Sequence, residues 1–273
     1  AKFTLLAIPF FILAGVIMEY AGISQRLIDL AQSLVGHFKS GFVLVTVIVA
    51  VFFAAISGSS PATVAAIGGI LIPALVKNGY KKESAASLVA SSGSIGIIIP
   101  PSIAFIVFAV VAGDQIPISI GRLFIAGIIP GVLLAIGLVF AMLFVRWRND
   151  KKRIEYNEVK DEIAASASTE RASMKDIGKS LSQAIWGLLI PVIILGGIYG
   201  GIFTPTEAAV VAVFYGLFVG FFIYKELNFK KLYNILIDAS VQTAVVMFIV
   251  STASIFAYVV TTEQIARDIS NSL

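Results

Sequence analysis

Long uncharged stretches alternate with short polar breaks along the 273 residues of the chain. No Asp, Glu, Lys or Arg occurs in residues 40–76, 84–113, 123–145, 180–206 or 208–224. Uncharged apolar stretches of about 18 residues or more are typical of membrane-spanning helices. A transmembrane β-barrel would show short segments of alternating polarity, whereas these stretches are continuous. The pattern therefore predicts an all-α polytopic membrane protein.

The composition agrees with this class and excludes several kinds of site. The chain is 58% hydrophobic and 13% charged, whereas a soluble domain is about 25% charged. It contains no Cys, which excludes disulfides, Cys metal sites and thiol nucleophiles. Its single histidine, His37, lies at a predicted membrane edge. A surface position is commoner there than a ligand role.

The basic residues follow the expected topology. Cytoplasmic loops of membrane proteins collect Lys and Arg. Basic breaks alternate with base-poor breaks, such as residues 113–119 and 200–207, and sixteen of the twenty bases fall in breaks that this alternation places inside. The basic residues behind the net charge of +4 therefore indicate which loops lie on the cytoplasmic side. No nucleic-acid partner is expected.

Residues 40–76 must enter the membrane and return to the same side, because Lys39 and Lys77 flank them in two basic breaks. These 37 residues reach about 55 Å as helix, and two full crossings need about 40 residues plus a turn. The return limb, residues 64–76, is only about 20 Å long. We expect a re-entrant helical hairpin whose tip, residues 57–63, stops inside the membrane. The alternative is an ordinary pair of short helices with an exposed turn.

The next uncharged stretch, residues 84–113, crosses once but is interrupted near its centre. Gly93 and Gly96 weaken a helix there, and Pro100 and Pro101 remove two backbone donors. We expect a discontinuous helix. Unwound backbone at membrane depth persists only where it is buried in protein or lines a polar cavity. Two such breaks side by side indicate a transport site.

The residues at the two breaks favour an uncharged oxygen site. Ser60 as N-cap with Pro61 at the first helical position, and Pro101 in a second half-helix, would each present free backbone N–H groups to an anion. The helix ends near Ile56 and Ile99 leave carbonyls without partners. Hydroxyl groups are contributed by Ser57, Ser59, Ser60, Thr63, Ser91, Ser92 and Ser94.

Hydroxyls and carbonyls suit a hard monovalent cation such as Na⁺. A proton relay would need Asp, Glu or His, and the two stretches contain none. Na⁺ is therefore favoured over H⁺ as coupling ion. The alternative is that these small residues serve only close helix packing.

At these residues the chain resembles a known family. "AISGSSPATVAAIGGILIPAL", "SSGSIGIIIPPSIAF" and "TPTEAA" are similar to the large membrane (M) subunit of the tripartite ATP-independent periplasmic (TRAP) transporters, the DctM type. The resemblance covers essentially the whole chain. It implies an elevator-type transporter in the bacterial inner membrane, which imports an organic anion such as a C4-dicarboxylate or sialic acid by Na⁺ symport.

The resemblance also implies partners and site residues. The partners would be a small membrane (Q) subunit and a periplasmic substrate-binding (P) protein, with no cofactor other than the coupling ion. Carried over by position, the Na⁺ and substrate sites would be lined by Ser57, Gly58, Ser59, Ser60, Pro61, Thr63, Ser91, Ser92, Gly93, Ser94, Gly96, Pro100 and Pro101. The Na⁺ ligands would come from Ser57, Ser59, Ser60, Thr63 and Ser94.

An internal repeat is faintly visible at a constant offset of 239 residues. It pairs Gln25, Asp29, Leu30, Ser33 and Leu34 with Gln264, Asp268, Ile269, Ser272 and Leu273. The family has two inverted repeats, each with an arm helix, a hairpin and a broken helix. We therefore expect an inverted-repeat fold with an incomplete second repeat, in a fragment that does not transport alone.

The expected organisation has six parts. They are a first span with an amphipathic arm helix at 1–39, a transport core at 40–119, a scaffold helix at 120–148, a cytoplasmic loop at 149–178, scaffold helices at 179–235, and the start of a second repeat at 236–273.

Other functions fit the sequence less well. A channel or a non-transporting membrane scaffold is the main alternative, and it predicts continuous helices and no ion dependence at the hairpin tip. An intramembrane serine protease fails, because Ser92 occupies the first glycine position of Gly-x-Ser-x-Gly and the only histidine is at the membrane edge. An ATP-driven pump lacks a phosphate-binding loop motif. We do not expect an enzyme.

Overall fold

The computed structural model describes residues 3–38, 40–112, 118–154 and 173–264, and within these ranges the secondary structure is helical. The elements are η1 Phe3–Leu6, α1 Ala7–Tyr20, α2 Ile23–Val35, α3 Gly41–Ser57, α4 Ser60–Lys77, α5 Lys82–Gly93, η2 Ser94–Ile97, α6 Ile103–Ala112, α7 Ile120–Ile154, α9 Met174–Tyr199, α10 Pro205–Phe218, the π-turn η3 Val219–Ile223 and α11 Phe229–Thr262.

Six described helices are long and apolar enough to cross a membrane. They cover Phe3–Tyr20, Ser60–Lys77, Ile120–Arg148, Met174–Tyr199, Pro205–Ile223 and Phe229–Thr262. The apolar helices α3 and α6 are shorter. The prediction of an all-α polytopic membrane protein is confirmed.

Local sequence determines where several helices begin. The Thr204 hydroxyl accepts the Glu207 backbone N–H, the Glu207 carboxylate accepts the Thr204 backbone N–H, and Pro205 occupies the first turn of α10. Ser173 and Asp176 form a second capping box at α9. These caps satisfy backbone donors that a helix start leaves free.

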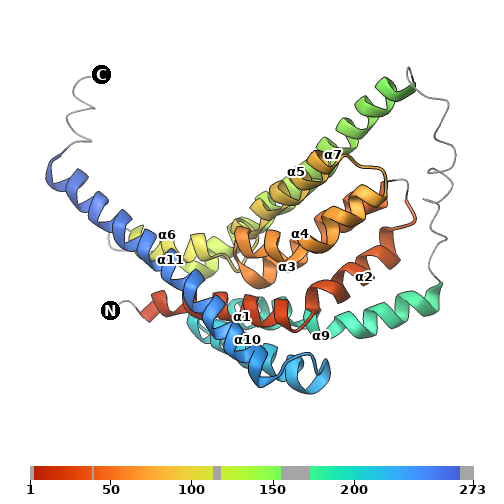
Figure 1. Ribbon diagram of the computed structural model, residues 1–273. Coiled ribbons are helices and arrows are strands. Elements are labelled where there is room, and N and C mark those ends of the chain that lie inside the picture. The colour runs from red at the N-terminus through yellow and green to blue at the C-terminus, as the bar shows by residue number, and fades with distance from the viewer. Residues whose placement is uncertain (1–2, 39, 113–117, 155–172, 265–273) are drawn as a thin grey trace.

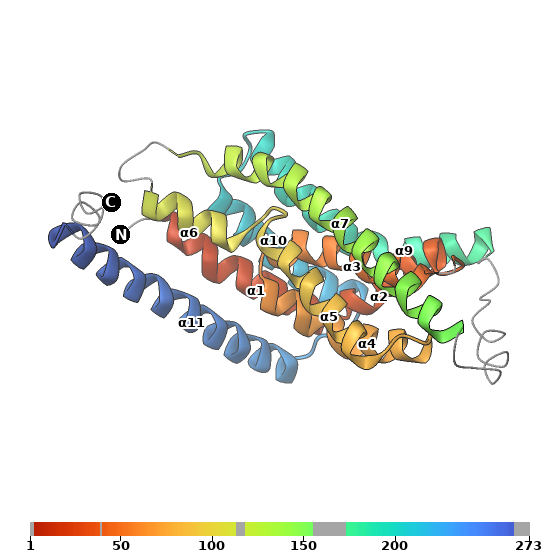
Figure 2. The ribbon, with the colours of Figure 1, turned by 90° about the horizontal axis from the view of Figure 1, so that it is seen from above.

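The helices form two bundles that meet along α1. Helices α1, α9, α10 and α11, called here the α1 bundle, are joined by the packing of α1 against α10 and α11 and of α10 against α9. Helices α3, α4 and α5, called here the hairpin bundle, pack against one another, and α2 links the bundles by contacting both α9 and α3 (Figure 1). The long helix α7 runs along the hairpin bundle and α6 (Figure 2). Because lipid is as apolar as the protein interior, close packing holds such helices together.

The hairpin exists, but its return limb is longer than expected. The expected limb begins at residue 64, whereas α4 begins at Ser60 and has 18 residues, about 27 Å. The prediction of a limb too short to cross is therefore wrong, because it counted the limb from residue 64 and left out residues 60–63, which are already helical.

The tip still ends within the depth of a neighbouring span. A Cβ added to Gly15, inside α1, would lie 3.2 Å from the Cα of Ser57. The tip therefore packs against the side of α1, near its middle, and does not extend past either end of that helix.

Helix α7 continues to Ile154 and α9 begins at Met174, so the segment expected as a partly helical cytoplasmic connector, 149–178, is helical at both ends. Its part from 155 to 172 lies outside the described residues, as do four of the repeat positions, Asp268, Ile269, Ser272 and Leu273.

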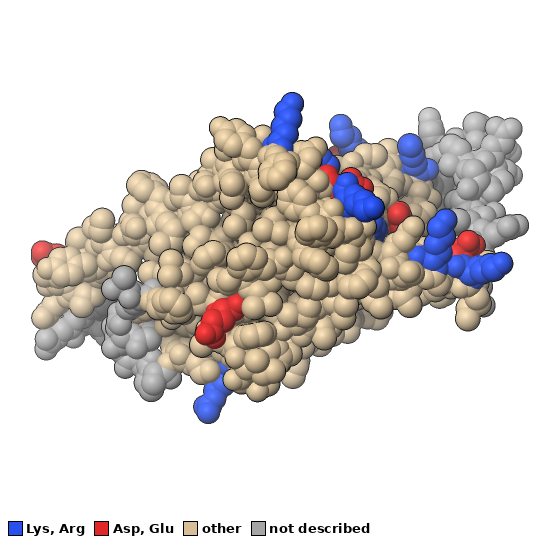
Figure 3. All heavy atoms as spheres, turned by 90° about the horizontal axis from the view of Figure 1, so that it is seen from below, with Lys and Arg blue, Asp and Glu red and all other residues tan. Residues whose placement is uncertain are grey.

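Charged side chains gather toward one end of the molecule. On the face in Figure 3, most Lys and Arg lie toward the end where α4 meets α5 and where α7 ends. There the Arg146 guanidinium donates to the Tyr80 hydroxyl over 2.6 Å and to the Ser40 hydroxyl over 3.4 Å. These bonds connect α7 to the residues just before α3 and just after α4, called here the open end of the hairpin.

Candidate functional site

The tip of the hairpin consists of Gly58 and Ser59. Gly58 ends α3 in the left-handed conformation, with φ of 61°, and its N–H donates to the Ala54 carbonyl over 2.9 Å. Ser59 is extended and is the N-cap position of α4, although its side chain makes no capping bond. The expected N-cap at Ser60 is therefore wrong by one residue, because Ser60 already has helical geometry.

Three oxygen atoms converge just behind this tip. The Ser57 and Thr63 hydroxyl oxygens lie 3.1 Å apart. The Thr63 hydroxyl donates to the Ser59 carbonyl over 2.8 Å, and that carbonyl lies 3.3 Å from the Ser57 oxygen. The Ser57 and Thr63 side chains are only 1% and 0% exposed. The tip therefore holds a buried group of two hydroxyls and one carbonyl, called here the oxygen cluster.

The broken helix lies directly against this cluster. A Cβ on Gly96 would lie 2.9 Å from the Ser59 carbonyl oxygen and 3.0 Å from the Thr63 hydroxyl. A Cβ on Gly93 would lie 2.3 Å from Val64 Cγ2. Gly96 therefore lets the broken helix lie against the oxygen cluster, and Gly93 lets it lie against Val64, at distances where a Cβ would overlap.

A backbone bond joins the tip to the second half of the broken helix. The Ile103 N–H donates to the Gly58 carbonyl over 3.2 Å. On the other side, a Cβ on Gly58 would lie 2.5 Å from the Pro101 carbonyl oxygen. The two breaks thus form one contact region, although residues 64–90 lie between them in the sequence.

Ser102 belongs to this region, although it is not among the site residues predicted from the sequence. Helix α6 begins at Ile103, so the expected start at Pro101 is wrong. The Ser102 hydroxyl accepts the Phe105 N–H over 3.3 Å and donates to the Ile97 carbonyl over 2.7 Å, and it is fully buried. A serine directly before an apolar run is an N-cap signal that could have identified it.

We expect Ser102→Ala to destabilise the protein by about 1–2 kcal/mol, because it removes a cap and leaves the Ile97 carbonyl without its donor. Thermal unfolding in detergent measures this. Ser33→Ala is the matched control, since the half-buried Ser33 hydroxyl also donates to a backbone carbonyl, that of Leu30, over 2.7 Å. An equal effect of both substitutions would contradict a special role of Ser102.

The remaining predicted site residues divide into two sets. Ser60 and Ser94 are half-buried beside the contact region, and Pro100 and Pro101 are buried within the break. Ser92 is fully buried, and its hydroxyl has no hydrogen-bond partner within the described residues. Ser91 and Pro61, in contrast, are exposed. The fold therefore buries or half-buries most of the predicted residues and leaves these two exposed.

The contact region offers only neutral oxygen atoms and helix ends. The carbonyl end of α3 and the N–H end of α4 meet at the tip, so partial charges of both signs lie next to the oxygen cluster. Neutral oxygens are ligands for hard cations. The arrangement suits a small cation beside an anionic group.

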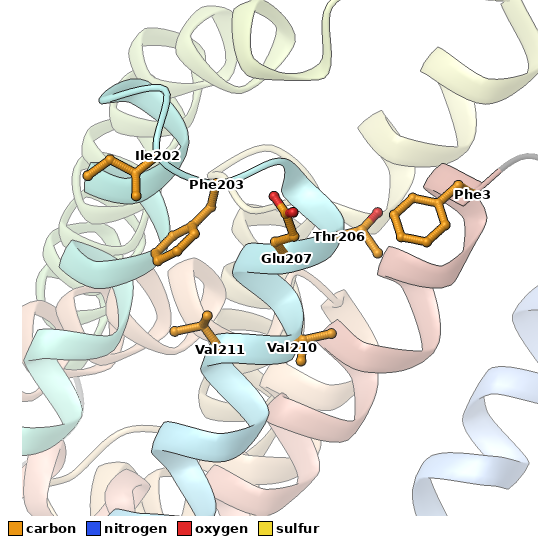
Figure 4. Close-up of a pocket in the computed structure, with 7 residues that line it drawn as sticks. All are labelled: Phe3, Ile202, Phe203, Thr206, Glu207, Val210 and Val211. Carbon is orange, nitrogen blue, oxygen red and sulfur yellow. The ribbon is translucent and has the colours of Figure 1, made fainter.

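A separate groove lies away from the hairpin tip. It encloses about 420 Å³ and is lined by Phe3, Ile202, Phe203, Thr206, Glu207, Val210 and Val211, from η1, the loop after α9, and α10 (Figure 4). Its one carboxylate, that of Glu207, is bonded to the Thr204 N–H over 2.7 Å and to the Thr204 hydroxyl over 2.8 Å. Apart from Glu207 and Thr206 the lining side chains are apolar, and the groove shares no lining residue with the oxygen cluster.

Comparisons with known proteins agree along the whole chain. The family model described as "Tripartite ATP-independent periplasmic transporter, DctM component" matches residues 1–273. The chain is 42% identical over 269 residues to the C4-dicarboxylate TRAP transporter large permease protein DctM of Pseudomonas aeruginosa, covering 98% of this chain and 58% of that protein.

Two further relatives carry other substrate names. The chain is 42% identical over 272 residues to the 2,3-diketo-L-gulonate TRAP transporter large permease protein YiaN of Escherichia coli, covering 100% of this chain and 60% of that protein. It is 36% identical over 270 residues to the sialic acid TRAP transporter permease protein SiaT of Haemophilus influenzae, covering 99% of this chain and 41% of that protein. The chain thus spans at most 60% of the length of these relatives.

Proposed function

Because the chain belongs to the DctM component family of the tripartite ATP-independent periplasmic transporters, we propose that it is part of the large permease subunit of a Na⁺-coupled importer of organic anions. Members of this family are transporters and not enzymes. By its family and its helices of membrane-spanning length, the chain is a multi-pass membrane protein, and the proposal places it in the bacterial inner membrane.

The oxygen cluster is the observation that carries the proposal. Ser57, Ser59 and Thr63 supply two hydroxyls and one carbonyl within 3.3 Å of one another. Neither 40–76 nor 84–113 contains an Asp, Glu, Lys, Arg or His residue. A coupling ion at this position therefore meets neutral oxygens, which favours Na⁺ over a proton carried by a side chain. Ser60 and Ser94, half-buried nearby, complete the proposed ligand set.

The substrate is proposed from the names of the relatives. A C4-dicarboxylate, a diketogulonate and a sialic acid are all carboxylic acids. The backbone N–H groups that begin α4 and α6 give a partial positive charge beside the proposed Na⁺ position. A carboxylate bound there is stabilised by both.

The remaining parts of the proposal concern movement and partners. The hairpin bundle and the broken helix move together against the α1 bundle, as in an elevator, because the Gly58–Ile103 backbone bond joins them. A small membrane subunit accompanies the large one, and a periplasmic binding protein delivers the substrate. The apolar faces of the described helices contact the lipid bilayer.

A cysteine-labelling experiment tests the proposed Na⁺ site. The chain has no Cys of its own, so Ser60→Cys gives one reporter at the half-buried start of α4. In the complete natural protein purified in detergent, with any cysteines elsewhere replaced, Na⁺ is expected to slow maleimide labelling several-fold, and K⁺ is not. Ser84→Cys is the control, since it is equally half-buried but lies at the open end of the hairpin.

Labelling of Ser60→Cys that is fast in both salts would contradict the proposal. That result would favour the alternative of a channel or scaffold protein, in which the hairpin tip responds to no ion. Slowing by Na⁺ at both Ser60→Cys and Ser84→Cys would also contradict it, because a general tightening of the protein does not require a site at the tip.

A further inference from the structure

The corner between α1 and α2 is closed by the side chain of Arg26. Its guanidinium donates to the Gly22 carbonyl over 2.9 Å and to the Ala21 carbonyl over 3.3 Å. These carbonyls follow the end of α1, where a helix has unpaired acceptors and a partial negative charge. Gly22 has φ of 70°, and a Cβ there would lie 2.8 Å from the guanidinium. Arg26 therefore fills the space beside Gly22 and bonds the two carbonyls of this corner.

The same guanidinium reaches the segment between η3 and α11. It lies 3.8 Å from the centre of the Tyr224 ring and donates to the Glu226 carboxylate over 3.4 Å. Lys231 approaches Glu226 from α11, donating to its backbone carbonyl over 2.7 Å. The Glu226 and Leu227 N–H groups donate to the Gly220 carbonyl over 3.1 and 3.2 Å. The loop that receives Arg26 is thus itself held in place.

Two further bonds connect this corner to α9 and α11. The Tyr224 hydroxyl donates to the Gln183 carbonyl of α9 over 2.7 Å. The Tyr20 hydroxyl, at the end of α1, donates to the Asp238 carboxylate of α11 over 2.6 Å. Beside them, a Cβ on Gly187 of α9 would lie 2.8 Å from Ile23, the first residue of α2. All four helices of the α1 bundle or their connections therefore meet at the start of α2.

Helix α2 is also the covalent link from the α1 bundle to the hairpin bundle. It is followed directly by α3, against which it packs. If α2 moved with the hairpin, it would have to break the Arg26 contacts with Tyr224 and Glu226. If α2 stays with the α1 bundle, those contacts persist, and the change in direction falls between α2 and α3, after Val35.

We infer that Arg26, with Tyr224, Glu226 and Lys231, anchors α2 to the α1 bundle, so that α2 stays with that bundle while the hairpin moves. This inference rests on the proposed function, because it assigns α2 to the stationary side of the proposed movement. Arg26 acts as a positioning residue and touches neither ion nor substrate. Arginine suits this role because its planar group stacks on an aromatic ring and donates several hydrogen bonds at once.

Spin-label distances in the complete natural protein in nanodiscs test the anchor. One pair, Gln32→Cys with Val241→Cys, joins exposed positions of α2 and α11. A second pair, Ala65→Cys with Val241→Cys, joins the exposed side of α4 to α11. The α2 distance is expected to be narrow and equal with and without Na⁺. Arg26→Gln is expected to broaden its distribution about twofold, and Glu226→Gln to broaden it less, since the contacts of Arg26 with Tyr224 and the two carbonyls remain.

Arg122→Gln is the matched control, because Arg122 is an exposed arginine on α7 that is remote from the corner in sequence and lies in another helix. An α2 distance that shifts with Na⁺ in the unmodified protein would overturn the anchor. An α2 distribution that Arg26→Gln leaves unchanged would overturn it as well.

The second pair separates this inference from the proposed function. An α4 distance that shows no response to Na⁺ or to a C4-dicarboxylate contradicts the proposed movement. Broadening of the α2 pair by Arg26→Gln would in that case still support the contact, but the anchor's part in transport would be overturned. A change in the α4 distance with a constant α2 distance supports both.

Discussion

Gly58→Ala is expected to destabilise the protein strongly, because it adds a methyl group at the hairpin tip where both the backbone conformation and the space are unfavourable. An alanine with positive φ costs about 1–2 kcal/mol, and the new Cβ would lie 2.5 Å from the Pro101 carbonyl oxygen. Relieving that overlap moves the tip away from the break and strains the Gly58–Ile103 backbone bond, adding roughly 1–3 kcal/mol. Thermal unfolding in detergent is expected to show a decrease of roughly 5–15 °C.

Gly79→Ala is the matched control for this substitution. Gly79 also has positive φ, 83°, but a Cβ there meets no atom within 4 Å. It therefore reports the cost of the backbone conformation alone, and the difference between the two variants reports the contact between tip and break. Equal decreases in unfolding temperature would contradict that contact. Na⁺-dependent uptake by the complete transporter is expected to be lost in Gly58→Ala and retained in Gly79→Ala.

Thr63→Val is expected to weaken Na⁺ binding without unfolding the protein. Valine keeps the shape of threonine but removes the hydroxyl from the oxygen cluster, where it lies 3.1 Å from the Ser57 oxygen. The loss of one buried oxygen ligand corresponds to about 1–3 kcal/mol, or roughly a 10–100-fold lower affinity. The measurement is the Na⁺ concentration that half-protects Ser60→Cys from maleimide.

Thr46→Val controls for the general cost of removing a buried threonine hydroxyl. Thr46 is also fully buried in the hairpin, and its hydroxyl donates to the carbonyl four residues earlier, that of Phe42, over 2.7 Å. Thr63 makes the same kind of bond, to Ser59 over 2.8 Å. The Thr46→Val midpoint for Na⁺ should match that of the unmodified protein. An unchanged midpoint in Thr63→Val would remove this hydroxyl from the proposed site.

Much of the site could be located from the sequence, because the residue types that interrupt its helices, glycine and proline, can be read directly from it. Gly58 and Pro61 interrupt an uncharged stretch, and so do Gly96, Pro100 and Pro101, whatever the rest of the fold does. The helix starts were less accurate. Ser59 occupies the capping position predicted for Ser60, and α6 begins at Ile103, two residues after the helix start predicted at Pro101. A helix start depends on where the backbone turns, which sequence locates only to within a residue or two.

The burial of individual site residues could not be predicted from the sequence. Ser91 and Ser92 are adjacent and identical in type, yet Ser91 is exposed and Ser92 is fully buried. Their difference depends on which side of α5 faces α4, and α5 has small residues on several sides. Position along the chain could not distinguish them.

The sequence by itself determined that the chain lies in a lipid bilayer and that it is helical. It also determined the alternation of basic and base-poor loops and the two helix interruptions, at the hairpin tip and in the broken helix. Each depends on residues close together in the chain. Only the tertiary structure decided that Gly58 meets Pro101, that Gly96 faces the oxygen cluster, and that Arg26 reaches Glu226 200 residues away. The physical reason is that a helix such as α11 is apolar nearly all round. Because lipid and protein interior are equally apolar, its hydrophobic pattern does not reveal which face meets a neighbour, and close packing between distant helices makes that choice.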